Sequence, residues 1–145
     1  MNDIVIEVVD FNENLSEITK IRMTVFIQEQ HVPEELEWDE FDAESTHFLA
    51  YYKGKAVGTA RLLKDGHIGR MAVLKDYRNR NIGKNMLKYI LQLAEKRLYK
   101  DILLSAQEHA IEFYKKQGFS VISNVYQDAD IPHYDMKYSG SLNES

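Results

Sequence analysis

The chain has 145 residues, with 18 basic and 23 acidic side chains and a formal net charge of −5 at pH 7. This length predicts one domain with a sizeable core. The acidic balance disfavours a general nucleic-acid binder, which needs a basic excess to neutralise phosphates. No apolar run approaches the roughly 20 residues that cross a bilayer. We therefore expect a globular protein with neither a nucleic-acid nor a membrane partner.

The chain contains no cysteine, which excludes disulfides, thiolate catalysis and cysteine metal sites. The first residues, Met1 to Asp3, lack the basic and apolar regions of a secretory signal, so we expect a cytoplasmic location. We also expect no metal site, because ligand spacings such as H-E-x-x-H are absent around His31, His47, His67 and His109.

The first half of the chain predicts a strand, a helix and then an antiparallel meander of three strands. Residues 4–9 alternate and predict a strand, and apolar positions at helical spacing predict a helix from Leu15 to about Gln28. Residues 32–44 have no clean period and predict a loop with at most a short helical turn, held to the body by Trp38. Three strands are then expected at 48–53, 55–64 and 66–73, joined by hairpin turns at Lys53-Gly54 and Asp65-Gly66.

The second half predicts a long amphipathic helix from Gly83 to near Lys100, with Met86, Leu87, Ile90, Leu91, Ala94 and Leu98 on its apolar face. A strand at 101–106, a helix at 107–117 stopped by Gly118, and strands at 121–125 and 133–138 follow, with a connector at 128–132. This order indicates an α/β fold with one mixed sheet and helices on both faces. We assign residues 1–138 to the domain and 139–145 to a polar tail.

The most informative segment, residues 78–84, joins the third meander strand to the long helix. The amide groups that begin a helix have no partner inside it, and the helix dipole makes that end attractive to anions. Gly83 removes a side chain, Asn81 tolerates positive φ, and Arg78, Arg80 and Lys84 add positive charge. The segment predicts a phosphate site, although it matches neither the nucleotide P-loop nor the dinucleotide motif.

Segment 78–84 resembles the [QR]-x-x-G-x-[GA] signature of the GCN5-related N-acetyltransferases, with Asn81 in place of the middle glycine. Residues 70–74 look like the family's central strand, and residues 110–119 look like its late helix and Gly-Phe stop, so the resemblance covers nearly the whole chain. Residues 25–30, 32–35, 57–61 and 131–133 look like a bacterial subgroup that includes the ElaA and YjcF proteins.

This resemblance implies a single-domain fold with a mostly antiparallel central sheet, and acetyl coenzyme A as the cosubstrate. It implies that the backbone of Met71 and Val73 bonds the pantetheine arm, and that the pyrophosphate lies in the turn. The coenzyme-binding residues that we predict are Met71, Ala72, Val73, Arg78, Asn79, Arg80, Asn81, Ile82, Gly83, Lys84 and Phe113.

The implied reaction is direct attack of a primary amine on a thioester, through a tetrahedral intermediate. Tyr114 resembles the family's tyrosine acid, which donates a proton to the departing sulfur. An amine with a pKa near 10.4 must first lose a proton, and Glu29 and His133 are candidate bases or acceptor contacts. The acceptor is expected to be a small-molecule or peptide amine.

The acidic segment 29–44 carries eight carboxylates and no lysine or arginine. One hypothesis is that it attracts a cationic acceptor, and the alternative is a solvated lid that Trp38 and Phe41 anchor. Two rivals to the enzyme also stay open: a non-catalytic acyl coenzyme A sensor or partner-binding module on the same fold, and a nucleotide-binding regulatory domain. A late exposed strand would allow a homodimer.

Overall fold

The computed structural model describes residues 3–140. Its eight strands form one mixed sheet in the order β1-β2-β3-β4-β5-β8-β6, with β7 paired to β8. Among the strand pairs of these residues, only β4–β5 is parallel. This confirms the predicted mixed, mostly antiparallel sheet. The strands are β1 (Ile4–Val9), β2 (Thr46–Tyr52), β3 (Lys55–Leu62), β4 (His67–Val73), β5 (Leu103–Gln107), β6 (Phe119–Val121), β7 (Tyr126–Asp128) and β8 (Ile131–Tyr138).

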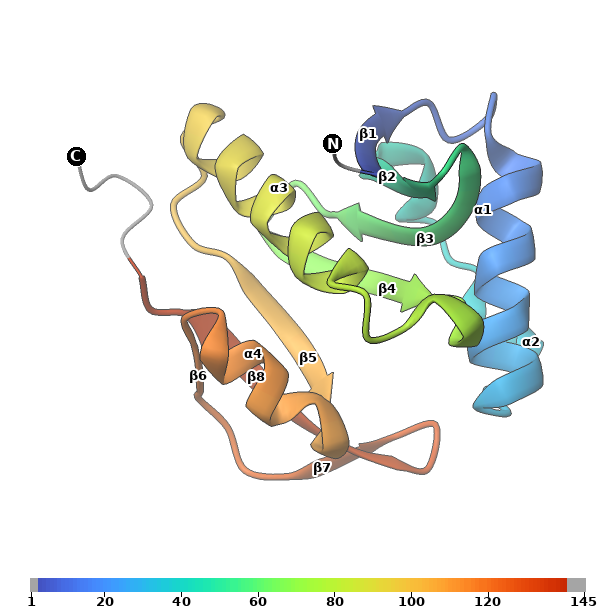
Figure 1. The fold of residues 1–145 in the computed structure, drawn as a ribbon. Helices are drawn as coiled ribbons and strands as arrows, with labels where there is room; N and C mark the ends of the chain where they lie inside the picture. The colour runs from blue at the N-terminus through green and yellow to red at the C-terminus, as the bar shows by residue number, and fades with distance from the viewer. Residues whose placement is uncertain (1–2, 141–145) are drawn as a thin grey trace.

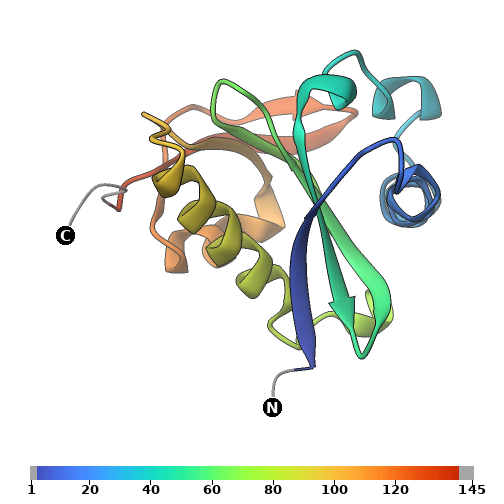
Figure 2. The same cartoon turned by 90° about the horizontal axis from the view of Figure 1, so that it is seen from above.

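The helices cover both faces of the sheet, as predicted (Figures 1 and 2). One face carries α1 (Leu15–Arg22), which continues into a π-helical segment (Met23–Glu29), and the short α2 (Glu34–Glu37) follows. The other face carries α3 (Ile82–Lys96) and α4 (Ile111–Lys116), the latter preceded by a 3₁₀ turn at Glu108–Ala110. None of the helices in residues 3–140 has the length and apolar character that a membrane crossing requires.

The alternation of side chains along β2 explains this arrangement. Leu49 is buried against Ile18 and Ile21 of α1, whereas Phe48 and Ala50 belong to the larger core that α3 covers. Successive residues of a strand point to opposite faces, so this strand contributes to both cores. The apolar face of α3 is buried as predicted at Met86, Leu87, Ile90 and Ala94.

The end of α3 differs from the prediction. The helix stops at Lys96, and Leu98, expected on the apolar face, has φ +60° and is 79% exposed. A left-handed residue cannot continue a right-handed helix, so apolar spacing alone placed this end too late.

The C-terminal strands also correct the prediction. The expected strand at 121–125 is replaced by β6, which ends at Val121, and β7, which begins at Tyr126. Val121 and Val125 are 36% and 49% exposed. The apolar residues of this segment therefore do not form the buried face of a strand. The connector at 128–132 is a tight turn in which Ala129 and Asp130 have φ +52° and +62°. Because such turns favour Asn-Gly or Asp-Gly, the sequence Ala-Asp gave no hairpin signal.

Strand β4 carries the irregularity that opens the sheet. Thr59 and Arg61 of β3 pair with Ala72 and Gly69, so β4 has one extra residue, and Arg70 has φ +50°. The parallel pairing of β4 with β5 consists of His67 with Leu103 and Ile68 with Leu104. Beyond these pairs the two strands diverge (Figure 1), so within residues 3–140 the far half of β4 has no strand paired to that edge.

Most of the predicted tail, residues 141–145, lies outside the described residues. Ser139, its first residue, donates from its N–H to Gly118 O at 2.7 Å. This bond ties Ser139 to the turn after α4.

Candidate active site

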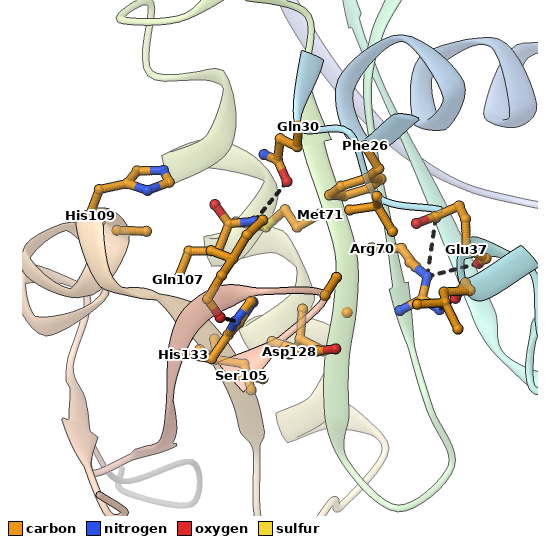
Figure 3. Close-up of a pocket in the computed structure, with 18 of the residues that line it drawn as sticks. Phe26, Gln30, Glu37, Arg70, Met71, Ser105, Gln107, His109, Asp128 and His133 are labelled. Atoms are coloured by element: carbon orange, nitrogen blue, oxygen red, sulfur yellow. Dashed lines mark hydrogen bonds and ion pairs between the residues drawn. The ribbon is translucent and has the colours of Figure 1, made fainter. Parts of the chain in front are cut away.

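Two cavities meet where β4 and β5 diverge. The first, here called the turn cavity, has a volume of about 490 Å³ and is lined by β4, the segment 77–84 and α4. The second, here called the sheet cavity, has a volume of about 340 Å³ and lies between β4, β5, the β7–β8 hairpin and the π-helical segment (Figure 3). Met71, Ala110 and Tyr114 line both cavities. The two spaces therefore adjoin around Tyr114.

The turn cavity has the start of α3 in its wall. Asn79 and Asn81 have φ +64° and +66°, and the first helical bond runs from Asn85 N–H to Asn81 O at 2.9 Å. The amides of residues 82–84 precede that bond, and the Asn81 side chain makes no capping hydrogen bond. Such unpaired amides at the positive end of a helix dipole form an anion site.

Gly83 keeps the cavity open. A Cβ built on this residue would lie 3.8 Å from Phe113 Cζ and 4.0 Å from Val73 Cγ2, which are ordinary contacts that would occupy cavity space. The backbone here does not require a glycine, unlike that at Gly118, where φ is +100°. Gly83 therefore leaves room in the cavity, and its backbone conformation is one that any residue could adopt.

Arg78 lines the turn cavity but already has partners. Its Nη1 and Nη2 atoms donate to Glu29 Oε2 and Oε1 at 2.6 and 2.7 Å, and its Nε donates to Val73 O at 2.9 Å. The two hydrogen bonds from Arg78 hold the pKa of Glu29 below its usual value. Glu29 is thus an ionised partner of Arg78 and is not among the residues that line either cavity.

Arg80 and Lys84 differ in position. The guanidinium of Arg80 lies over the rings of Tyr52 and Tyr77, with centroid distances of 5.2 and 5.9 Å, and the residue is not in the turn-cavity wall. Lys84 is in that wall. The structure therefore brings together the predicted coenzyme residues with the exception of Arg80, at Met71, Ala72, Val73, Arg78, Asn79, Asn81, Ile82, Gly83, Lys84 and Phe113.

Tyr114 occupies the junction of the cavities. Its ring packs edge-on against Phe113 and Phe119, at centroid distances of 5.1 and 5.9 Å. Burial raises the pKa of its hydroxyl to about 12. The hydroxyl is therefore protonated at neutral pH and is able to donate a hydrogen bond to a group held between the two cavities.

His133, the other candidate base, does line the sheet cavity. Its Nδ1 lies 2.7 Å from Ile131 O, and because a carbonyl only accepts, Nδ1 carries a proton and donates it. In the neutral imidazole, Nε2 is then the acceptor. Across the same cavity, Gln107 Nε2 donates to Gln30 Oε1 at 2.7 Å (Figure 3). This bond joins β5 to the residue that follows the π-helical segment.

A cluster of buried charges lies beside the sheet cavity, and no pattern in the sequence predicts it. Arg22 donates to Glu37 Oε2 and Asp42 Oδ1 at 2.8 and 2.9 Å, and Arg61 donates to Asp39 and Asp42 at 2.7 and 2.8 Å. Arg70, on the β4 bulge, pairs with Glu37 and Asp39 at 3.1 Å each. We call these six residues the arginine cluster. Burial raises the pKa of Glu37, whereas hydrogen bonding to Arg61 lowers that of Asp39.

The arginine cluster corrects the premise that the acidic segment is uncompensated. Of its eight carboxylates, Glu29, Glu37, Asp39 and Asp42 are in ion pairs with arginines from other elements. Trp38 lies 4.6 Å from the Arg22 guanidinium, as expected for an anchor, but Phe41 is 45% exposed and does not anchor the segment. No local pattern in the sequence indicates these pairs, because the partners lie 15 to 49 residues apart.

Within residues 3–140, no three or more His, Asp or Glu side chains gather in a way that would hold a metal ion.

A model of the acetyltransferase (GNAT) domain matches residues 13–139 of the chain. The uncharacterized N-acetyltransferase YjcF of Bacillus subtilis (strain 168) is 38% identical over 128 residues, which are 86% of this chain and 91% of that protein. Among solved structures, Escherichia coli ElaA has a TM-score of 0.83 at 26% identity, covering 92% of this chain and 98% of that one.

A further solved structure, Arabidopsis thaliana Naa50 in complex with the bisubstrate analogue CoA-Ac-MVNAL, has a TM-score of 0.74 at 25% identity. The match covers 96% of this chain and 100% of that chain. In that protein the fold is therefore seen with a coenzyme A analogue.

Proposed function

Because the chain belongs to the acetyltransferase (GNAT) family, and is therefore an acyltransferase, we propose that it transfers an acetyl group from acetyl coenzyme A to a primary amine. The acceptor is a small molecule or peptide. Its amine attacks the thioester directly, so that no covalent enzyme intermediate forms. The observation that carries this proposal is the meeting of two chemically different cavities at Tyr114.

The turn cavity fits the coenzyme. The amides of Ile82, Gly83 and Lys84 would hold the pyrophosphate at the start of α3, with the Lys84 ammonium adding charge. The Leu74 N–H donates to Val57 O in β3 at 2.8 Å, so the backbone groups of Val73 and Met71 face the opposite, unpaired edge of β4. They would bond the pantetheine arm, although Val73 O already accepts from Arg78.

Bound acetyl coenzyme A supplies a thioester, whose carbonyl carbon is the electrophile. The Tyr114 hydroxyl, protonated because its pKa is about 12, donates to the departing sulfur. The sheet cavity holds the amine, whose proton leaves toward acceptors such as His133 Nε2. The walls of this cavity, including Phe26 and Met71, exclude part of the surrounding water.

Tyr114→Phe tests the proposal, because it removes the hydroxyl and keeps the ring contacts. We expect a fall in kcat of about 100-fold with the coenzyme A dissociation constant, measured by calorimetry, within about twofold of the wild-type value. Tyr89→Phe is the matched control, since Tyr89 packs on Phe48 in the core. A variant with undiminished turnover would show that Tyr114 is not the acid.

Gly83→Asp tests the coenzyme site separately. The carboxylate would stand against the phosphates in the turn cavity, so we expect coenzyme A affinity to fall by at least about tenfold. Gly83→Asn, which has nearly the same volume without the charge, separates repulsion from steric loss. Unchanged affinity in Gly83→Asp would place the pyrophosphate elsewhere.

A further inference from the structure

Three polar side chains of the sheet cavity, those of Ser105, Gln107 and His133, share one face of the β5–β8–β7 sheet. In β5, Leu104 and Ala106 are buried in the core under the helices, so Ser105 and Gln107 point to the opposite face. Register places Ser105 beside Asp135 and Gln107 beside His133, and His133 beside Tyr126. Figure 3 shows Ser105, Gln107 and His133 together at the cavity.

A chain of hydrogen bonds leads from this face toward solvent. Ser105 Oγ bonds the Tyr126 hydroxyl, and the Tyr126 hydroxyl bonds Asp135 Oδ1 at 2.6 Å. Ser105 and Asp135 are both exposed, and Tyr126 between them is half-buried. The Asp135 N–H donates to Ser123 Oγ at 2.8 Å. The three side chains thus connect the open wall of the cavity, where Ser105 lies, to a carboxylate on the molecular surface.

The direction of this chain follows from the number of hydrogens. A carboxylate only accepts, and a tyrosine hydroxyl has one hydrogen, so Tyr126 donates to Asp135 and Ser105 donates to Tyr126. The Ser105 hydroxyl has then donated its one hydrogen, so toward a ligand its oxygen can only accept hydrogen bonds. The chain therefore presents an acceptor to the cavity, which suits a ligand rich in N–H groups.

We propose that Ser105, Tyr126 and Asp135 form a relay that carries the proton of the acceptor ammonium out of the sheet cavity. This inference rests on the proposed acetyl transfer to an amine. One N–H proton passes to Ser105 Oγ while the Ser105 proton passes to Tyr126 and the Tyr126 proton passes to Asp135. The amine becomes neutral, the carboxylate becomes a carboxylic acid, and that acid then releases the proton to water.

His133 offers a different route for the same proton, through Nε2. Its ring is stacked on that of Tyr126 at a centroid distance of 6.1 Å, and Asp128 is the other ionisable side chain of the hairpin in the cavity wall, with His109 opposite. The relay differs from the histidine route because it has no basic group at the cavity end. It therefore depends on the two hydroxyl groups acting together.

The test compares two acceptors of nearly equal shape. Benzylamine is protonated at neutral pH and must lose a proton before it attacks, whereas O-benzylhydroxylamine is already neutral. For Tyr126→Phe and Ser105→Ala we expect kcat/KM with benzylamine to fall by about 100-fold and that with O-benzylhydroxylamine by less than about threefold. A purely structural role of the chain would lower both values equally.

Tyr134→Phe is the matched control, because Tyr134 pairs with Ala106 and lies on the other face of β8 from Asp135. His133→Gln tests the alternative route. The relay is refuted if Tyr126→Phe lowers kcat/KM equally for the two acceptors. It is also refuted if only His133→Gln lowers kcat/KM for benzylamine more than for O-benzylhydroxylamine.

A second measurement does not depend on turnover. With ¹³C-labelled tyrosine, benzylammonium should shift the Cζ resonance of Tyr126 in the wild-type protein but not in Ser105→Ala, because Ser105 links the ligand to the ring. No shift in the wild type would overturn the relay. A shift without acetylation of either amine would instead leave the contact intact and count against the proposed function.

Discussion

Glu29 and Arg78 are two predicted site residues that form an ion pair with each other in the fold. They lie 49 residues apart in the sequence and are joined by two hydrogen bonds. Glu29 ends the π-helical segment, and Arg78 begins the turn before α3. Since the carboxylate of Glu29 neutralises the cation that the turn offers, the pair lowers the positive charge that a pyrophosphate would meet in the turn cavity.

Glu29→Gln should therefore tighten coenzyme A binding. The amide removes a negative charge from beside the turn while Arg78 Nε keeps its bond to Val73 O. Because the pair is partly exposed and solvent screens it, we expect only about a twofold to fivefold fall in the dissociation constant, largest at low salt. Calorimetric titration with coenzyme A at two salt concentrations measures it.

Glu95→Gln makes the same change in net charge near the other end of α3 and should leave the affinity unaltered. Weaker binding in Glu29→Gln would mean that the carboxylate holds Arg78 in a productive position for the phosphates. In that case Arg78 itself belongs to the coenzyme site, as its place in the motif suggests.

Single-residue predictions succeeded where the reason was local. Asn81 was expected to adopt positive φ, and it does so at +66°; Gly118 was expected as a left-handed cap and has φ +100°. The arginine cluster could not be predicted, because Arg61 and Asp39 meet across 22 residues only once the bulged β4 and the acidic segment are in place. Charge counting along the chain misses such long-range compensation.

The secondary-structure elements that the sequence predicts best are those with a clear apolar period or clear turn residues at their ends. The amphipathic pattern located α3, and turn residues located the hairpins after Tyr52 and Leu62. The β4 bulge was not predictable, because its left-handed residue is Arg70, with φ +50°, a residue type that gives no turn signal. The bulge is held by tertiary contacts, with Arg70 bonded to Glu37 O and paired with Asp39.

Gly118→Ala should destabilise the joint between α4 and β6. The backbone has φ +100° there, and an added Cβ would lie 2.8 Å from Tyr138 Cε1. Strain and contact together predict a loss of about 1–3 kcal/mol in the free energy of unfolding, measured by urea denaturation.

Gly83→Ala provides the control for that experiment. Its Cβ meets nothing closer than 3.8 Å and its backbone is helical, so alanine should leave stability equal or raise it by about 0.4–1 kcal/mol. Equal losses in the two variants would contradict the view that conformation matters at Gly118 and cavity space at Gly83.

The molecule as a whole is one sheet that opens between β4 and β5, and the site occupies the opening. The sequence predicted the sheet, both helix layers and the turn that lines the turn cavity. It did not predict the sheet cavity, whose walls include β5, the π-helical segment and the β7–β8 hairpin. Those segments meet only through the tertiary fold, as the Gln30–Gln107 bond illustrates.

Global stability should depend on pH through His47. This side chain is buried, its Nε2 lies 2.7 Å from Asp42 O, and its ring stacks on Phe11 at 4.4 Å. Burial holds the pKa of His47 below its usual value. As pH falls through about 6.5, where an unfolded histidine binds its proton, the unfolded state gains a proton that the folded state resists, so stability decreases.

His47→Gln should flatten this part of the pH dependence, since glutamine keeps a donor for Asp42 O and does not titrate. The free energy of unfolding, from urea denaturation at pH 7.5, 6.5 and 5.5, should fall on acidification by at most about 1.4 kcal/mol per pH unit in the wild type. Glu37 acts in the opposite sense, because its raised pKa lets the folded state take up a proton before the unfolded state does. Equal slopes for the two proteins between pH 7.5 and 5.5 would show that His47 does not set the acid sensitivity.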